Sequence, residues 1–161
     1  MPAKQRPKPL VADVDPLIDE VNRKILRALH ADPRASRAQL ARDVGMSAPA
    51  LTERVERLER AGVIRGFRMD VDPAALGLPV SAFVRVRLSP GQLAKVTELA
   101  QQLPQVSECH RITGEDCFLI RVHAAAVDRL EEVLDRFLLY GQTVSSFVVS
   151  TPVPPRPLPV P

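Results

Sequence analysis

The hydrophobic residues of this 161-residue chain change their spacing near residue 67. From about residue 15 to residue 64 they recur every three or four positions, which is typical of helices with one buried side. From residue 67 to residue 150, short alternating segments typical of strands are interspersed with helical segments. Two periods in succession predict an α+β protein with a helical domain first and a mixed domain second.

Three helices are expected in the first domain. The apolar stripe of the first helix consists of Ile18, Val21, Ile25 and Leu29, and Pro33 ends that helix. Ser36 and Gln39 form a capping-box pattern at the start of the second, in which the Gln39 side chain reaches back to the cap. Gly45, Met46 and Ser47 form a tight turn, and Ser47 caps a third helix that ends at Gly62. A short helix, a three-residue turn with glycine and a longer helix have the spacing of a helix-turn-helix motif.

The second domain reads as strand, helix, strand, strand, helix, strand. The strands are expected at about 82–88, 106–113, 117–123 and 143–150, and the helices at about 93–103 and 127–137. This βαββαβ order is the ferredoxin-like unit. Its helices cover only one face of the sheet, so the other face should be buried by a partner, and the small size of each domain also favours oligomers.

Both ends of the chain carry proline. Residues 1–14 also carry lysine and arginine, and we expect a loose arm there. Residues 151–161 contain six prolines, so they should form an extended, polyproline-like tail and no helix or central strand.

Composition excludes several classes of protein. Hydrophobic residues make up 45% and charged residues 25%, which is globular composition. No uncharged apolar run is long enough to span a bilayer and no secretory signal follows Met1, so a soluble protein is expected. Two cysteines exclude a disulfide scaffold and fit a reducing cytoplasm. Aromatic residues, at 4%, are too few to favour stacking on single-stranded nucleic acid.

The excess positive charge lies entirely in residues 1–72, which hold 14 Lys and Arg against 11 Asp and Glu. A recognition helix reads base edges with its N-terminal residues while neighbouring cations hold phosphates. The residues expected to face double-stranded DNA are Arg37, Ser47, Pro49, Ala50, Thr52, Glu53, Arg54 and Arg57. The alternative is a solvated helix surface on which the arginines only pair with neighbouring glutamates.

A second candidate site is the loop from Thr113 to Asp116, with Gly114 and Glu115 between them. Its hydroxyl and backbone amides offer donors to a carboxylate, and its acids offer partners to an ammonium group. The alternative is an ordinary hairpin loop, in which Gly and Asp serve turn geometry.

Nothing indicates catalysis, a cofactor or a metal site. Cys109, His110, Cys117 and His123 cluster in sequence, but without the spacing of a zinc motif. Buried structural cysteines and surface histidines explain them better. We therefore expect no enzyme.

Four ordered motifs resemble the Lrp/AsnC family of bacterial and archaeal transcriptional regulators. They are Asp19-Glu-Val-Asn-Arg-Lys-Ile-Leu, Leu40-Ala-Arg-Asp-Val-Gly-Met-Ser, Arg54-Val-Glu-Arg-Leu-Glu-Arg-Ala-Gly-Val-Ile-Arg-Gly-Phe and Val106-Ser-Glu-Cys-His-Arg-Ile-Thr-Gly-Glu-Asp. The resemblance covers about residues 15–150 and leaves the tail outside.

The resemblance implies a winged helix-turn-helix domain over residues 15–66 and a linker strand and hinge over 67–79, with the strand near Phe67–Met69. It also implies a ligand-sensing, oligomerising domain over 80–150. Arg54 stands where the family has its recognition-helix arginine, and the Thr113–Asp116 loop falls on the effector loop. Gln142 and Thr143 fall on a second effector segment. Where many members carry an acid two positions after the loop's acidic residue, this chain has Cys117, and its acid lies one place earlier at Asp116.

The resemblance further implies homodimers, which assemble into octamers in some members, and a response to an amino acid bound between dimers. The hypothesis is a cytoplasmic regulator that binds a palindromic operator and an amino-acid-like effector. Two alternatives stay open: an architectural DNA-binding protein without an effector, and an enzyme like the tetrapyrrole decarboxylases that resemble this family.

Overall fold

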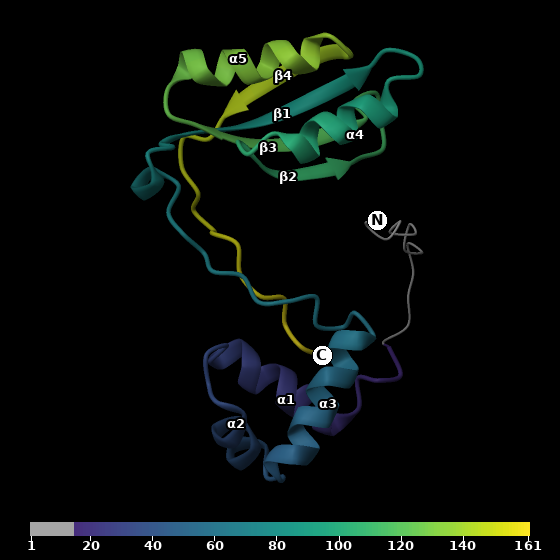
Figure 1. Ribbon diagram of the computed structural model, residues 1–161, viewed down its shortest axis with the longest axis vertical. Helices are drawn as coiled ribbons and strands as arrows, with labels where there is room; N and C mark the ends of the chain where they lie inside the picture. Colours follow the sequence, from purple (N-terminus) through teal and green to yellow (C-terminus); the bar gives the residue numbers. More distant parts are fainter. Residues whose placement is uncertain (1–14) are drawn as a thin grey trace. The chain divides into compact units, whose positions relative to one another are not determined.

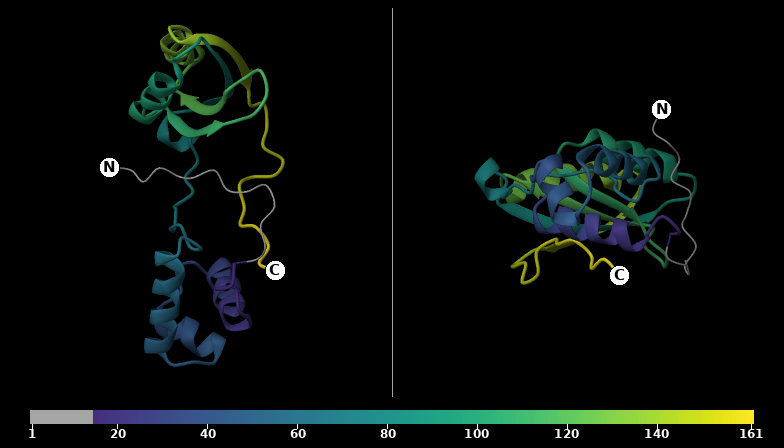
Figure 2. Two further views of the ribbon diagram at one scale, coloured as in Figure 1. Left: turned by 90° about the vertical axis from the view of Figure 1, so that its right-hand side faces the viewer. Right: turned by 90° about the horizontal axis from the view of Figure 1, so that it is seen from below.

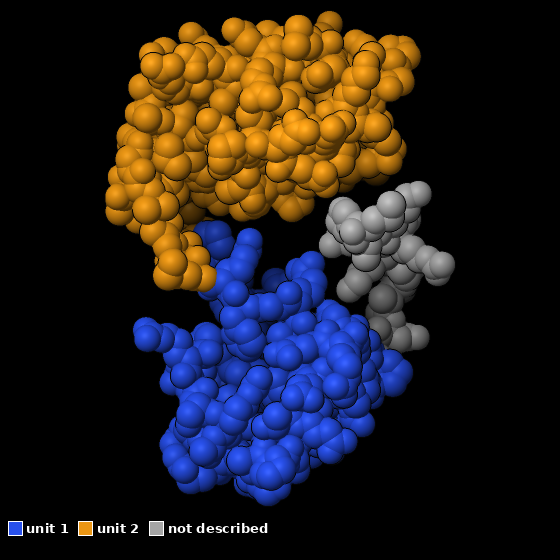
Figure 3. All heavy atoms as spheres, in the orientation of Figure 1, with its two compact units in different colours: residues 1–68, 155–161 blue, residues 69–154 orange. Residues whose placement is uncertain are grey.

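The computed structural model describes residues 15–161, so the arm expected over residues 1–14 lies outside the described residues. The chain divides into two units, coloured separately in Figure 3. The first contains the residues up to Arg68 together with Pro155–Pro161, and the second is Met69–Pro154. Within the described part, no helix is both long and apolar enough to cross a membrane.

The first unit contains α1 (Glu20–Ala31), α2 (Arg37–Val44) and α3 (Ala48–Arg60) (Figure 1). The predicted caps of α2 and α3 are confirmed: the Ser36 and Ser47 hydroxyls accept hydrogen bonds from the backbone N–H of Gln39 (3.2 Å) and Ala50 (3.4 Å). Gly45 takes the left-handed conformation, with φ of 77°, and so turns the chain from α2 into α3.

The capping box at α2 is only half formed. The Gln39 side chain does not return to Ser36 but donates its Nε2 to the Asp43 carboxylate, one turn further along, at 2.7 Å. The Gln39 Oε1, which would have to accept from the Ser36 N–H, accepts instead from Nη2 of Arg42. A charged donor makes a stronger hydrogen bond than a backbone N–H, so the reciprocal bond expected from the sequence is wrong.

Each of the three helices contributes to one small core. Its fully or almost fully buried apolar residues are Ile25, Leu29, Leu40, Ala41, Leu51 and Val55. Burying each of the larger side chains stabilises the unit by about 1.5–3 kcal/mol. This packing fixes which side of α3 faces inward and therefore which side is left for a partner.

The second unit is a four-stranded antiparallel sheet with two helices. Its elements are a short 3₁₀ helix (Ala74–Leu76), β1 (Val80–Leu88), α4 (Leu93–Gln102), β2 (Val106–Arg111), β3 (Phe118–Ala124), α5 (Val127–Leu138) and β4 (Gly141–Phe147). The strand order is β2-β3-β1-β4. The predicted ferredoxin-like βαββαβ fold is confirmed (Figure 1).

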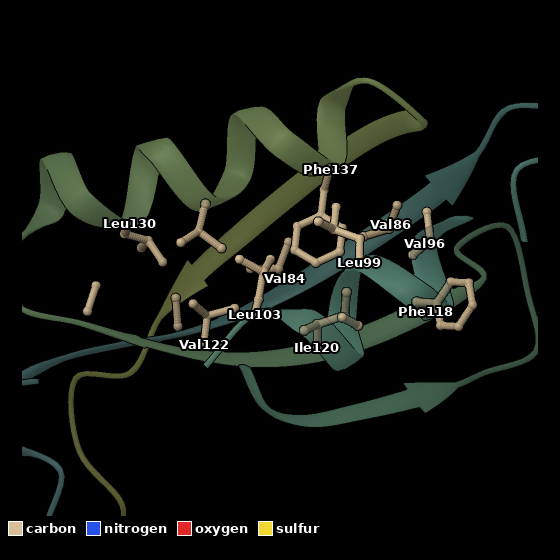
Figure 4. Packing of buried hydrophobic residues seen from close by; sticks show 14 residues of the cluster. Val84, Val86, Val96, Leu99, Leu103, Phe118, Ile120, Val122, Leu130 and Phe137 are labelled. Atoms are coloured by element: carbon tan, nitrogen blue, oxygen red, sulfur yellow. The ribbon is translucent and has the colours of Figure 1, made fainter. Parts of the chain in front are cut away.

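Helices α4 and α5 lie against one face of this sheet (Figure 2). Val84 and Val86 of β1 are fully buried there, and Leu99 of α4 and Phe137 of α5 pack around them (Figure 4). The opposite face is not covered in the single chain. We call it the outer face, and it carries the side chains of Phe83, Arg85, Arg87, Arg121 and Val144.

The structure differs from the sequence-based expectation at the linker. Residues 65–72 lie in no helix or strand, although a strand was expected near Phe67–Met69. Among the described residues, no backbone hydrogen bond joins residues 65–71 to another segment. A strand needs a paired neighbour, and a single chain offers none here.

The tail has no helix or strand, as its prolines predict. Residues 155–161 belong to the first unit, and Arg27 of α1 donates a hydrogen bond from Nη2 to the backbone oxygen of Pro161 at 3.1 Å.

Candidate functional site

The exposed side of α3 is the first candidate site. Leu51, Val55 and Leu58 are buried on its inner side. Ser47 and Pro49 at the start of the helix are exposed, as are Glu53 and Arg57 further along, whereas Ala50 is half-buried. The structure therefore presents most of the N-terminal residues expected to face DNA on one accessible surface.

The other three residues of the expected DNA surface have partners within the protein. Arg37 Nη2 lies 3.8 Å from Glu59 Oε1, and the Thr52 hydroxyl donates to the Ala48 carbonyl at 2.9 Å. Arg54 Nη1 donates to Asp19 Oδ2 at 3.0 Å and to Asn22 Oδ1 at 3.1 Å. Arg37 and Arg54 are thus paired with acids that are distant in sequence. The alternative of pairing with a neighbouring glutamate describes Arg60, whose Nη1 lies 3.6 Å from Glu56 Oε2.

Arg57 differs from these arginines. Its side chain is exposed, and within residues 15–161 it makes no ion pair shorter than 4 Å. Its charge nevertheless contributes to lowering the pKa of Asp19 on α1, after the larger effects of the Asn22 N–H and of Arg54. Arg57 is therefore the arginine of α3 that makes no ion pair within the described residues, whereas Arg54 and Arg60 each make one.

The second candidate site is the loop between β2 and β3. Gly114 has φ of 113°, which side chains rarely adopt, so a glycine is needed there. The Glu115 carboxylate is paired with Arg87. Asp116 lies 3.7 Å from Nη1 of Arg85 and 3.7 Å from Nε of Arg87. Both acids of the loop are thus neutralised by arginines of β1.

The second expected effector segment lies on the other side of β1. The sheet register pairs Gln142 of β4 with Arg87, and Thr143 with Val86. From the loop side, the Cys117 N–H donates to the Val86 carbonyl at 2.8 Å. Gln142 therefore shares the outer face with Arg87, whereas Thr143 lies on the face toward the helices. The two segments flank the end of the same strand.

Sequence reasoning missed Arg85 and Arg87 as part of this site. Their alternation with Val84 and Val86 was visible and indicated a strand with unlike faces. What the sequence did not reveal is that β1 lies beside the loop of residues 113–116, because that depends on the strand order β2-β3-β1-β4.

The cysteine and histidine residues are not arranged as expected. Cys109 is exposed, and His123 is buried with 7% of its surface accessible, so the expectation of buried cysteines and surface histidines is wrong for both. His110 is exposed. Within the described residues, no group of three or more His, Cys, Asp or Glu side chains is placed to hold a metal ion.

Both domains of the chain match models of known families. Residues 18–65 match the model of a winged helix-turn-helix DNA-binding domain, and residues 81–158 match that of the Lrp/AsnC ligand binding domain. The HTH-type transcriptional regulator LrpC of Bacillus subtilis is 32% identical over 133 residues, which cover 83% of this chain and 92% of that protein. LrpA of Mycobacterium tuberculosis is 34% identical and covers 83% and 91%.

Solved structures of transcriptional regulators are also similar to this chain. The structure of B. subtilis LrpC is similar with a TM-score of 0.77, covering 83% of this chain and 95% of that one. A transcriptional regulator from Neisseria meningitidis, solved in complex with L-Met, is 25% identical with a TM-score of 0.75, covering 84% and 92%.

Proposed function

The chain belongs to the Lrp/AsnC family of DNA-binding transcriptional regulators, and from this premise we propose that it binds a specific operator through the exposed side of α3. One observation carries the proposal. The inner side of α3 is held in the core, while Ser47, Pro49 and Glu53 stay accessible at its first turns and Arg57 stays accessible in its last turn. N-terminal residues of a recognition helix are those that contact base edges in the major groove.

We propose that the protein acts as a homodimer formed through the outer face, with larger rings of dimers built from it. Phe83 and Val144 are exposed there by 37% and 49%, and they lie among arginines on a face that no helix covers. A two-fold dimer places two α3 helices on DNA, so the operator should be palindromic, with half-sites about one helical turn apart.

We propose further that an amino acid binds at the loop of residues 113–116 and changes the assembly or its DNA affinity. The site holds two acids, Glu115 and Asp116, and two arginines, Arg85 and Arg87, beside Gln142. A zwitterion carries one group for each kind of side chain. The N. meningitidis relative solved with L-Met supports this ligand class.

We assign the protein no catalytic role, because the relatives are named as transcriptional regulators. Binding to an operator places it with the DNA, in the cytoplasm of a bacterial or archaeal cell.

Selection of bound duplexes from a random DNA pool tests the proposal. The full chain is used at physiological salt, with and without a mixture of the twenty amino acids. We expect a palindromic site whose enrichment changes with the mixture, and Asp116→Ala should abolish the change but not the site. Recovery of no motif would instead support the architectural protein, which binds many sequences alike.

A further inference from the structure

The guanidinium group of Arg54 donates hydrogen bonds to the start of α1, although Arg54 lies in the middle of α3, the helix proposed to read DNA. The same Nη1 donates to Asp19 at 3.0 Å and to Asn22 at 3.1 Å. Asp19 is the N-cap of α1, and Asn22 lies in its first turn. The contact joins residues 35 and 32 positions apart, and it connects the start of α1 to α3.

The contact is not only a surface ion pair, because it includes the buried side chain of Asn22. Its side chain is fully buried, and its Nδ2 donates to the Leu17 carbonyl at 2.7 Å. Its amide oxygen accepts from Arg54, so both polar groups of the buried side chain have a partner. The Asn22 N–H in turn donates to Asp19 Oδ1 at 2.7 Å. Removal of Arg54 leaves a buried acceptor unpaired, which is far costlier than loss of an exposed contact.

We infer that Arg54 is a positioning residue, which fixes α3 against α1 through Asp19 and Asn22, and that Arg57 is the cation of α3 presented to DNA. The inference rests on the proposed function for its DNA contact. The positioning contact itself is a property of the folded chain, because every bond that carries it lies within the first unit.

The orientation of α3 matters because a recognition helix must place several side chains on base edges at once. When the contacts that support a functional side chain are lost, the side chain is displaced, and even a small displacement weakens binding strongly. The Arg54 side chain is 30% exposed, whereas its partner Asn22 is fully buried. Arg57 lies one turn further along α3, where it is exposed.

The first test is hydrogen exchange of the full chain without DNA, read from peptides covering α1 and α3. Arg54→Ala and Asp19→Ser are compared singly and together; serine keeps the N-cap of α1 but loses the bond to Arg54. We expect Arg54→Ala to speed exchange by roughly tenfold and Asp19→Ser to speed it less, because Asp19→Ser leaves the bond from Arg54 to Asn22 in place. The double change should add little to Arg54→Ala, which already removes both bonds. Arg57→Ala is the matched control and should leave exchange unchanged.

The second test is DNA binding by the same variants at several salt concentrations. Arg54→Ala should weaken binding without changing the preferred base at any position. Arg57→Ala should lower the slope of log affinity against log salt by about 1 if it contacts a phosphate, or relax the preference at one base pair if it contacts a base. Arg54→Lys keeps the charge and replaces Arg54→Ala if that variant does not fold.

Two results would overturn the positioning role: additive effects of Arg54→Ala and Asp19→Ser on exchange, or unchanged exchange in Arg54→Ala with relaxed preference at one base pair. Unchanged DNA binding in Arg57→Ala overturns the role of Arg57. A natural chain that selects no DNA site overturns the regulator itself, and the exchange measurements distinguish that case because they need no DNA.

Discussion

His123 on β3 is almost completely enclosed, although its side chain lies on the outer side of the sheet. Its Nδ1 is 2.7 Å from the Ser81 hydroxyl of β1, and its Nε2 is 3.0 Å from the Ser107 hydroxyl of β2. Burial lowers the pKa of His123 below its ordinary value of 6.5; the charge of Arg121 lowers it further, and that of Glu108 opposes the shift. The folded protein therefore favours the neutral ring.

We predict that this histidine makes the protein less stable in weak acid. The unfolded chain takes up a proton near pH 6.5, whereas the folded chain does so only at its lower pKa. The contribution of the neutral His123 ring to stability is fully present above pH 6.5 and is lost as the pH falls through the pKa of the folded state. The loss is about 1.4 kcal/mol for each unit by which folding lowers the pKa of His123.

Urea unfolding at pH 7.5 and pH 5 checks this prediction. The natural chain should lose more free energy of unfolding between the two pH values than His123→Gln does. His30→Gln, which changes an exposed histidine that makes no side-chain hydrogen bond or ion pair within residues 15–161, is the control and should behave as the natural chain. An equal loss in His123→Gln would show that another group is responsible.

The polar residues buried within the cores are one part of this structure that the sequence did not predict. The spacing of apolar residues identified Ile25 and Leu29, but Asn22 lies beside them and is equally buried. Its partner Arg54 is 32 positions away, and Ser81 is 42 positions from His123. Periodicity reports only on neighbours within one element, so it cannot reveal contacts of this kind.

Gly141 determines how closely β4 approaches β1. It is the first residue of β4 and pairs with Leu88. A Cβ atom built there would lie 2.1 Å from the Arg87 carbonyl oxygen, which is backbone and cannot move aside as a side chain can. The next residue of β4 is Gln142, so this approach also determines the place of a proposed effector residue.

We predict that Gly141→Ala destabilises the second unit by about 1–3 kcal/mol, the usual cost of overfilling a packed site. Gly91→Asn is the matched control: Gly91 has φ of 78° with no atom within 4 Å of a built Cβ, and asparagine tolerates that conformation. Denaturant midpoints of the two variants are compared. A Gly141→Ala midpoint equal to that of the control would contradict the close approach.

The kinds of elements and their order were predictable because each has its own hydrophobic period. The caps at Ser36 and Ser47 followed from local sequence as well. The expected strand near Phe67–Met69 did not form, since its partner would have to be another segment that residues 15–161 do not supply. The loop of residues 113–116 was identified in the sequence as a candidate effector site, but its arginine partners on β1 are evident only from the strand order β2-β3-β1-β4.

The outer face of the sheet is covered by no helix of the single chain and carries exposed apolar side chains, Phe83 and Val144. Arg121 bridges two of its residues: its Cζ lies 5.7 Å from the Phe83 ring centroid, and its Nη1 lies 3.3 Å from Glu108 Oε1. Val144 pairs with Arg85 across the sheet. Such a mixture of exposed apolar side chains and ordered arginines is typical of interfaces between proteins.

We predict that Val144→Glu converts the proposed dimer into a monomer of 17.7 kDa without unfolding it. The new carboxylate can pair with Arg85 on the neighbouring strand of a free chain, but in a dimer it must be buried against a second copy. We expect association to weaken by more than tenfold, measured by sedimentation equilibrium. Leu139→Glu is the control, because Leu139 is 77% exposed and lies with Tyr140 and Lys95 on the helical side. Dissociation by the control, or an unchanged mass in Val144→Glu, would place the dimer contact elsewhere than on the outer face.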